Sequence, residues 1–469
     1  MSEMSFESLQ ISTELAEHFA TSIYGLRAKA KALTGEVDFN FLLETPQGER
    51  YTLKVSRPNT SKIELSFQAA MMDYLADKSL PFQVPSVVRT QRKRWGQQII
   101  DEAGRERWVR LQKWIEGDEI IEVNPRDQKL LKSWGATSGY LSKALQGFDH
   151  PHAHRHFRWD PSQVLDTRAL VKYVQTEDQK ALLEYYWDLF LEEVEPLRAD
   201  LRKSVNHNDS HDRNVLVQRG ANEVVVSGVI DFGDAVYTET INELAIACAY
   251  ACMGQADPLR AAYWVVAGYN AVFPLQPNEL KALLPLIGAR LVITVSIAAQ
   301  NRVSEPENAY LQVSDEQAWE VLRFFRNVSP AFAEMTFREA CGMEPCPKRA
   351  FFNHWLKSTT PVFSNVVKLQ GKTIDLLDLS VGGPVLGNNS QYASGKAMHR
   401  TIFRYRTHFC LPLQRRGPDT SVHFCFFRPF RPLRRHKKDF WFSKSQANLS
   451  SFSAFADQLP VEPVAPADT

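Results

Sequence analysis

The stretch HNDSHDRNVLV at residues 207–217, followed by IDFGD at 230–234, decides the fold class. Asp209 and Asn214 share one short loop, and Asp231 comes seventeen residues after Asn214. Two β-branched runs separated by Arg-Gly-Ala-Asn fill the interval and predict a hairpin. Because the two open ends of a hairpin lie side by side, we expect Asn214 and Asp231 to be close together in space.

These side chains match the needs of phosphoryl transfer. The reaction depends on positioning, on charge neutralisation by a metal ion, and on a carboxylate that accepts the proton of the attacking hydroxyl. We expect Asp209 to be this catalytic base. Asn214 and Asp231 would supply hard oxygen ligands to Mg²⁺ on a nucleoside triphosphate. A structural turn is the alternative for the three residues together, and His207 is expected to pack and hydrogen-bond within the loop.

Strand patterns dominate the first part of the chain, and helical patterns dominate the rest. An amphipathic pattern over 12–25 predicts a first helix. A hairpin, a helix and two further strands are predicted at 39–44, 51–55, 63–75, 98–101 and 108–114. Beyond residue 117 the periodicity is mainly helical, with the clearest helices at 128–145, 178–197, 239–253, 258–269 and 316–325.

The 469 residues have the composition of an ordinary soluble globular protein. Apolar residues make up 44% and charged residues 23%, which excludes wholesale disorder, and the length predicts two or three structural units. The polar N-terminus lacks a secretory signal, so a cytoplasmic protein with reduced thiols is expected. The apolar stretch 282–299 contains Pro285 and Arg290, which predicts two buried helical pieces and no membrane span.

Three segments carry a resemblance to a known family: VNHNDSHDRNVLV at 205–217, VSGVIDFGD at 226–234 and NELAIACAY at 242–250. They resemble the aminoglycoside phosphotransferase/choline kinase superfamily, and within it the hydroxylysine kinase group, over residues 10–335. The resemblance implies an α+β, protein-kinase-like bilobal fold, with a β-rich lobe at 1–113 and a helical lobe at 114–335. It also implies transfer of the γ-phosphoryl group of ATP or GTP to the hydroxyl of a small amino alcohol or hydroxy amino acid.

The same resemblance assigns roles to residues outside the loop. Lys54, at the end of an apolar strand, is similar to the family's lysine that binds the α- and β-phosphates. A lysine at such a position requires an anionic partner. An exposed edge lysine is the alternative. Glu64 is the available acidic partner for Lys54, although the family pattern also fits an acid at position 66, where Ser66 stands. Lys113 and Trp114 would belong to the hinge that binds the nucleotide base through backbone groups.

Other polar residues allow both a functional and a structural interpretation. Asp212, Asp234 and Glu243 could bind a substrate ammonium group, and helix capping is the alternative for each. Histidines alternate at 150–156, HPHAHRH, which could indicate metal binding. The proline and the polar surroundings of that segment favour a solvated surface loop instead.

The C-terminal third differs from the rest of the chain. Residues 336–402 resemble the start of the peptidase-like region of phosphotransferase–aminotransferase fusion proteins, without the zinc-binding histidines that such a peptidase needs. From Arg400 to Lys444, twelve Lys and Arg and ten aromatic residues stand against two acidic ones. This mixture suits single-stranded nucleic-acid binding or a membrane surface, but a disordered or frame-shifted tail at 403–469 explains it better.

The sequence therefore predicts a small-molecule kinase that uses Mg²⁺ with ATP or GTP. Its expected partner is a small hydroxylated amine, and neither a membrane nor a nucleic acid is expected. The alternative functions are a non-catalytic nucleotide-binding module of the same fold, an aminoglycoside- or choline-type kinase, and an RNA-binding protein that uses the basic tail. The identity of the acceptor does not follow from the residues.

Overall fold

The structure, a computed structural model, describes most of the chain up to residue 347 and four short pieces beyond it. The described residues are 11–33, 35, 38–101, 104–220, 223–304, 315–347, 364–369, 372–377, 411–412 and 424–425. Residues 1–328 with 336–343 form one compact unit, and 329–335 with 344–469 form a second. The predictions for 336–402 and 403–469 lie largely outside the described residues. The exceptions are residues 336–347 and the strands β12 (Ser364–Leu369), β13 (Lys372–Leu377), β14 (Leu411–Pro412) and β15 (Phe424–Cys425).

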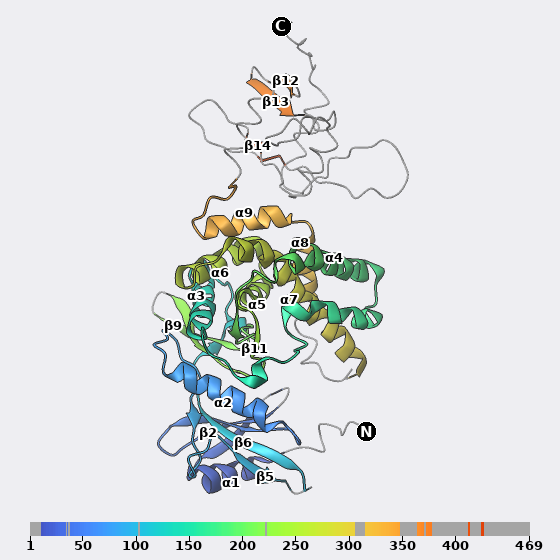
Figure 1. The fold of residues 1–469 in the computed structure, drawn as a ribbon. Coiled ribbons are helices and arrows are strands. Elements are labelled where there is room, and N and C mark those ends of the chain that lie inside the picture. Colours follow the sequence, from blue (N-terminus) through green and yellow to red (C-terminus); the bar gives the residue numbers. More distant parts are fainter. Residues whose placement is uncertain are drawn as a thin grey trace. The chain divides into compact units, whose positions relative to one another are not determined.

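The first lobe of the larger unit is an antiparallel sheet with the strand order β1–β2–β3–β6–β4, and β5 pairs with β6 (Figure 1). The strands are β1 (Lys29–Leu33), β2 (Phe39–Glu44), β3 (Arg50–Val55), β4 (Val87–Val88), β5 (Gln97–Ile100) and β6 (Glu106–Lys113). Helix α1 (Thr13–Tyr24) packs Phe19 and Ala20 against Leu53 and Val109 of the sheet. The predicted first helix and strands of this lobe are confirmed, and β1 and β4 are additions.

Helix α2 (Lys62–Ala76) belongs to a different core from that of the sheet. Its Phe67 and Met71 pack with Val205 and Phe232 of the second lobe. Among the described residues, the core formed by α1 and the sheet contains no member from α2. Accordingly, α2 lies between the sheet and the second lobe (Figure 1).

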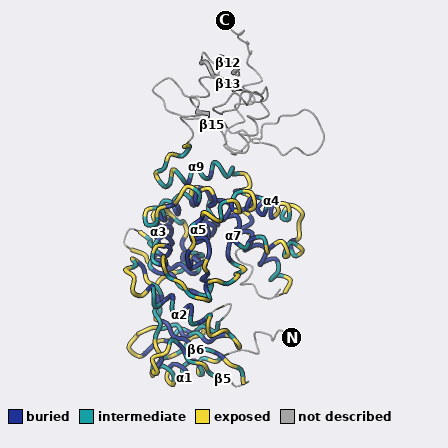
Figure 2. The backbone as a smooth tube through the Cα atoms, in the orientation of Figure 1, coloured by how far each residue is buried: buried dark blue, intermediate teal, exposed yellow. Residues whose placement is uncertain are grey.

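The second lobe is mainly helical, and its central helices are the most buried part of the chain (Figure 2). Its helices are α3 (Gln128–Ala144), α4 (Glu177–Glu193), α5 (Ile241–Cys252), α6 (Pro258–Val272), α7 (Pro277–Ser304) and α8 (Asp315–Arg326), while α9 (Pro330–Ala340) spans the boundary between the two units. Short 3-10 segments lie beside them, namely η2 (Ile120–Glu122), η3 (Pro151–Ala153), η4 (Pro161–Tyr173) and η5 (Glu195–Leu197). The five predicted helices are confirmed, although α4 ends at Glu193 because Pro196 interrupts the pattern.

Helix α7 corrects the prediction of two buried pieces at 282–299. It is continuous from Pro277 to Ser304, with Pro285 inside it. By length and composition α7 could cross a membrane, but its most apolar window is entirely buried within the lobe, as in the core helix of a globular protein. Arg290 does not interrupt the helix, because its charge finds partners across the lobe.

Two small sheets bring the loop after β8 next to the segment before β11. Strand β8 (Lys203–Asn206) pairs with β11 (Val236–Glu239). Between them, β9 (Val215–Arg219) and β10 (Val224–Val229) form the predicted hairpin, which β7 (Asp118–Glu119) extends. Both loops therefore leave their sheets at the same place, on the side of the helical lobe that faces α2 and β3.

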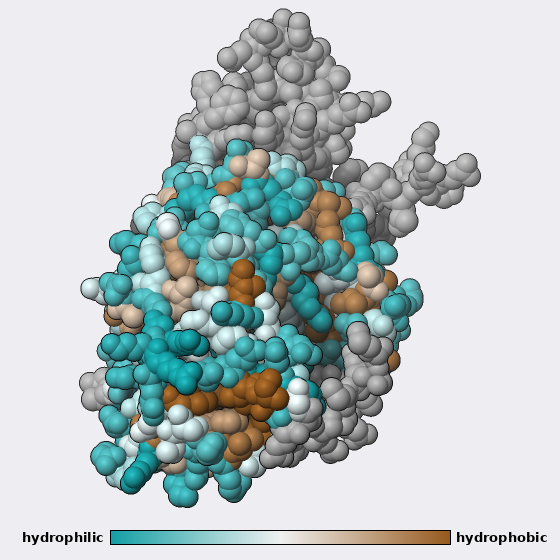
Figure 3. Space-filling model, turned by 60° about the horizontal axis from the view of Figure 1, so that its bottom comes forward, coloured by the Kyte–Doolittle hydropathy of each residue, from teal (hydrophilic) through white to brown (hydrophobic). Residues whose placement is uncertain are grey.

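The surface of the first lobe mixes hydrophilic and apolar side chains. Figure 3 brings this lobe forward and shows apolar patches between hydrophilic side chains. In the described part of the lobe, Ile63 and Ile100 are the exposed large apolar residues. Exposed apolar area of this kind is ordinary on globular proteins, so it indicates no particular partner.

Helices α3 and α6 approach so closely that glycine is required on both. A Cβ on Gly135 would overlap the backbone carbonyl of Val265, and a Cβ on Gly268 would overlap that of Lys132. Both obstacles are helix backbone, which cannot turn aside as a flexible side chain can. The contact between the two helices is therefore intolerant of any larger residue.

We expect Gly268→Ala to lower the melting temperature, because overpacking of this kind costs ~1–3 kcal/mol of the free energy of unfolding. Gly220→Ala is the matched control: it lies at a hairpin turn where an added Cβ would meet the Glu223 carbonyl oxygen at an ordinary 3.4 Å. Thermal unfolding measures the melting temperatures of the two variants and tests this expectation. Equal melting temperatures would show that the helices can move apart without cost.

Candidate active site

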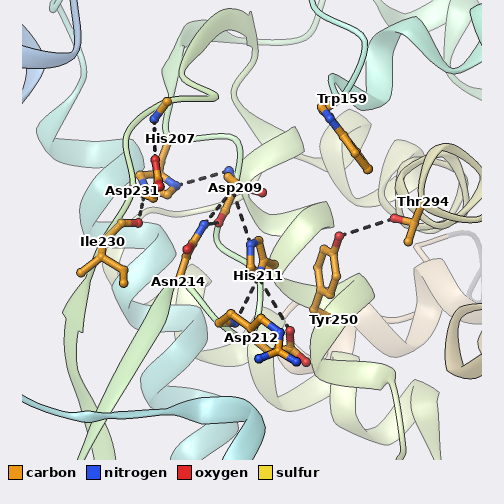
Figure 4. Close-up of polar contacts among 12 residues, drawn as sticks. Trp159, His207, Asp209, His211, Asp212, Asn214, Ile230, Asp231, Tyr250 and Thr294 are labelled. Carbon is orange, nitrogen blue, oxygen red and sulfur yellow. Dashed lines mark hydrogen bonds and ion pairs between the residues drawn. The ribbon is translucent and has the colours of Figure 1, made fainter. Parts of the chain in front are cut away.

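The loop after β8 and the segment after β10 are joined by hydrogen bonds. The Ile230 N–H donates to the Asn214 carbonyl oxygen at 2.9 Å. His207 Nδ1 accepts from the Asp209 N–H at 3.3 Å, so its Nε2 carries the proton and donates to the Ile230 carbonyl oxygen at 3.1 Å. Figure 4 shows Asp209, Asn214 and Asp231 close together beside His207. The predicted proximity of Asn214 and Asp231 is confirmed, and His207 has the structural role expected of it.

Both carboxylate oxygens of Asp209 receive a hydrogen bond. Asn214 Nδ2 donates to Oδ2 at 2.7 Å, and Arg290 Nη2 donates to Oδ1 at 3.0 Å. Because the amide nitrogen of Asn214 faces Asp209, its oxygen is left to act as an acceptor. His211 lies 3.5 Å from Oδ2. Although burial disfavours the charged ring, the carboxylates of Asp209 and Asp212 raise the pKa of His211 above its usual value.

An ion pair between Lys54 and Asp231 links the two lobes. Lys54 Nζ in β3 lies 3.1 Å from Asp231 Oδ2, and the Gly233 N–H donates to Oδ1 at 3.1 Å. Asp231 has a φ of 60°, a left-handed conformation that Asp tolerates better than most residues. The positive charge of Lys54 holds the pKa of Asp231 well below its usual range. Asp231 is therefore a carboxylate that faces the lysine expected to bind phosphate.

The oxygen atoms near Asp231 suit a magnesium ion that also binds phosphate. The Asp231 carboxylate and the free amide oxygen of Asn214 are hard donors. Within the described ranges, no group of three or more His, Cys, Asp or Glu could hold a metal ion. An ion at this place would rest on two protein ligands and on phosphate oxygens, which is the usual arrangement for Mg²⁺.

Glu64 is on α2 but does not contact the lysine. Across the described residues, the ion pair of Lys54 is with Asp231, and none joins it to Glu64. The charged groups near Glu64 are Arg155 and His152. A role for Glu64 in nucleotide binding stays a prediction.

The backbone N–H groups of the two predicted hinge residues already donate hydrogen bonds to other backbone groups of the protein. The Lys113 N–H donates to the Ser86 carbonyl oxygen at 3.0 Å, and the Trp114 N–H donates to that of Arg50 at 3.2 Å. The Trp114 indole Nε1 is buried without a hydrogen-bond partner. Binding of a base by Lys113 and Trp114 stays a prediction, and in this arrangement it would not use their N–H groups.

The three acidic candidates for ammonium binding differ in their partners. Glu243 in α5 accepts from the Asn208 N–H at 2.9 Å and from the Ser210 hydroxyl, so it braces the catalytic loop. Asp212 pairs with Arg126 at 3.5 Å. Asp234 has no hydrogen bond or ion pair to any other described residue. Burial, reinforced by the nearby negative charge of Asp209, raises the pKa of Asp234 well above its usual value.

The segment 150–156 is only partly the solvated loop that was predicted. His154 and His156 are exposed, but the His150 ring stacks on Phe67 of α2 at 5.1 Å between centroids. Arg155, which is largely buried, donates to the carbonyl oxygens of Gly233 and Ala235 at 2.9 and 3.1 Å. The segment therefore holds the backbone after Asp231 in place.

Arg155 and Arg290 are the site residues that sequence reasoning missed. Arg290 was interpreted as a break in an apolar stretch. The signal was nevertheless present, because a single charge inside an apolar helix requires a buried partner. Arg155 left no such signal, since its acceptors are backbone oxygens.

A buried polar cluster surrounds Asp160, the residue after Trp159, whose carbonyl oxygen accepts a hydrogen bond from Arg290. Asp160 Oδ1 accepts hydrogen bonds from the Ser162 N–H, the Thr238 hydroxyl and Asn242 Nδ2 at 2.9 to 3.0 Å. Burial, together with the neighbouring charge of Glu239, raises the pKa of Asp160 to about 6.

Comparison with known proteins agrees with this geometry. The family model described as the phosphotransferase enzyme family matches residues 29–277. A hydroxylysine kinase from Mus musculus is 27% identical over 353 residues, which cover 70% of this chain and 93% of the relative. An amicoumacin kinase in complex with AMP-PNP and Ca²⁺ has a TM-score of 0.52 at 16% identity and covers 67% of this chain and 94% of its own. A microcompartment-associated aminopropanol kinase has a TM-score of 0.50 at 19% identity, covering 70% and 99%. The α+β, kinase-like bilobal fold is thus confirmed.

The buried charge of Asp160 predicts a change of stability with pH. A carboxylate with a pKa of about 6 when folded and roughly 3.9 when unfolded makes the folded state less stable as pH rises between these values. Asp160→Asn keeps the shape of the side chain and an acceptor oxygen, but it cannot ionise. We expect the variant to exceed the wild type in free energy of unfolding by ~2–3 kcal/mol above pH 7, and by much less near pH 4. Urea unfolding at both pH values measures this, and a pH-independent difference would contradict it.

Proposed function

Because the chain belongs to the phosphotransferase enzyme family and is a small-molecule kinase, we propose that it phosphorylates the hydroxyl of a hydroxylysine-like amino acid or a small amino alcohol. The convergence of Asp209, Asn214, Asp231 and Lys54 at one place carries the proposal. The co-substrate is a nucleotide acting with a divalent cation, and we propose Mg²⁺ with ATP or GTP. The similarity to hydroxylysine kinases supports the acceptor class, and a cytoplasmic location stays part of the proposal.

Asp209 acts on the acceptor hydroxyl. Its carboxylate orients the hydroxyl group and accepts its proton as the hydroxyl oxygen bonds to the γ-phosphorus. The bond from the γ-phosphorus to the β–γ bridging oxygen breaks, and the nucleoside diphosphate leaves with that oxygen. The products are a phosphate monoester and a diphosphate, with the proton on Asp209.

Lys54 binds the phosphates directly, and Asn214 and Asp231 bind them through the metal ion. Mg²⁺ would supply the positive charge that neutralises the developing charge on the phosphate oxygens. The Asn214 amide oxygen and the Asp231 carboxylate would hold it. Lys54, already directed at Asp231, is within reach of the same phosphates.

Asp234 is the best candidate to bind the ammonium group of the acceptor. Asp212 and Glu243 are already bonded to Arg126 and to the catalytic loop. Burial and the charge of Asp209 raise the pKa of Asp234, so an ammonium group beside it would stabilise its carboxylate form. A cationic acceptor supplies it and would be bound with its hydroxyl near Asp209.

Acceptor specificity is the first test. Purified protein with ATP or GTP and Mg²⁺ is incubated with hydroxylysine, ethanolamine and other small amino alcohols, and nucleoside diphosphate release is measured. We expect acceptor-dependent release that EDTA abolishes, with a phosphate monoester visible by ³¹P NMR. The N-acetyl derivative of each acceptor is the matched control, and it should react poorly because it lacks the positive charge. Nucleotide hydrolysis that no acceptor stimulates would contradict the proposal.

The role of Asp209 gives a second test. Asp209→Ala removes the proton acceptor but none of the predicted phosphate ligands. We expect kcat to fall by ~10²–10⁴-fold while nucleotide affinity is retained. Asp73→Ala, which removes only an exposed ion pair with Arg89, is the control and should leave both unchanged. Turnover of Asp209→Ala at the wild-type rate would exclude Asp209 as the base.

A further inference from the structure

We propose that Arg290 is a positioning residue, which fixes the carboxylate of Asp209 for phosphoryl transfer and ties it to the backbone at Trp159. The inference deepens the proposed function and rests on it, because it assumes that Asp209 is the base. Arg290 belongs to α7, and 81 residues separate it from Asp209.

The guanidinium group of Arg290 connects three segments of the second lobe. It donates to Asp209 Oδ1 at 3.0 Å, to the Trp159 carbonyl oxygen at 2.8 Å and to the Tyr250 hydroxyl at 3.3 Å. The rings of Trp159 and Tyr250 lie 5.1 and 5.5 Å from its central carbon. The side chain is 2% exposed, so it is a fixed part of the interior rather than a group that reaches for ligands.

The free-energy cost of burying the Arg290 charge indicates that this residue is kept for a function other than stability. An arginine inside an apolar helix is unfavourable unless an acid and other acceptors surround it, and a well-packed apolar residue there is often at least as stable. Among the described residues, the carboxylate that pairs with Arg290 is that of the catalytic loop. The ion pair therefore contributes orientation to Asp209 where an apolar side chain would contribute only packing.

A hydrogen bond to only one carboxylate oxygen of Asp209 does not fix the orientation of the carboxylate. With Asn214 alone, the carboxylate is held at Oδ2 and can turn about its Cβ–Cγ bond. With Arg290 bound at Oδ1, the plane of the carboxylate is set. The planar guanidinium presents several donors in a fixed fork, so one side chain reaches Asp209 and the Trp159 carbonyl at once. A lysine has the charge but cannot make both bonds in this geometry.

The test compares Arg290→Ala and Arg290→Lys with the wild type, using the acceptor that the acceptor assay identifies. We expect kcat of Arg290→Ala to fall by about 100-fold, the loss typical of a misplaced reacting group. KM for the nucleotide should change little, because no phosphate ligand is removed. Added methylguanidinium should restore part of kcat, and Arg290→Lys should be intermediate.

Arg202→Ala is the matched control for loss of a buried ion pair. Arg202 binds Glu279 at 2.6 and 2.7 Å, and Glu279 is in the first turn of α7. This variant should lower the melting temperature but leave kcat unchanged. A merely structural Arg290 would behave in the same way, without rescue by methylguanidinium.

The outcomes separate the two proposals. A wild type without acceptor-dependent turnover overturns the proposed function, and this inference with it. An active wild type with wild-type kcat in a folded Arg290→Ala overturns the inference alone. If Arg290→Ala does not fold, Arg290→Lys decides, and wild-type kcat in that variant overturns the inference.

Discussion

A carboxylate can direct a proton transfer only while its orientation is fixed, and in this protein distant parts of the chain hold one aspartate. Asp209 is bound by Asn214 from its own loop and by Arg290 from α7. The loop is braced in turn by Glu243 of α5. Three segments of the helical lobe thus hold this carboxylate and its loop, and the β-rich lobe adds Lys54 through its contact with Asp231.

The elements of the fold could be predicted where the pattern was local. Alternation and turn residues gave the hairpins at β2–β3 and β9–β10, and periodicity gave the helices. The strand β1 could not be predicted, because its sequence KAKAL has weak strand propensity and is stabilised by pairing with β2. Helix α7 was predicted as two pieces because Pro285 normally ends a helix. Its complete burial stabilises it as one helix instead.

The site residues likewise divide into those that a local sequence pattern specifies and those that it does not. Asp209, Asn214 and Asp231 are linked by a single hairpin, so their meeting follows from spacing. The contacts of Arg290 and Arg155 join segments about 80 residues apart, and no local pattern specifies such pairs. The ion pair of Lys54 follows the same rule, because it joins residues 177 positions apart, and a role for Glu64 stays a prediction.

The separation of the two apolar cores affects how the lobes can move. Helix α2 shares its core with the helical lobe, and Val87 of β4 packs against that core, so opening would leave the core around α1 intact. In the described residues, the polar links from the sheet to α2 and the helical lobe include the Lys54–Asp231 ion pair and the hydrogen bond from Arg110 to Gln68 at 2.6 Å. The donors of both links are largely buried, so salt would screen them only weakly. The spacing of the two lobes would therefore depend little on ionic strength.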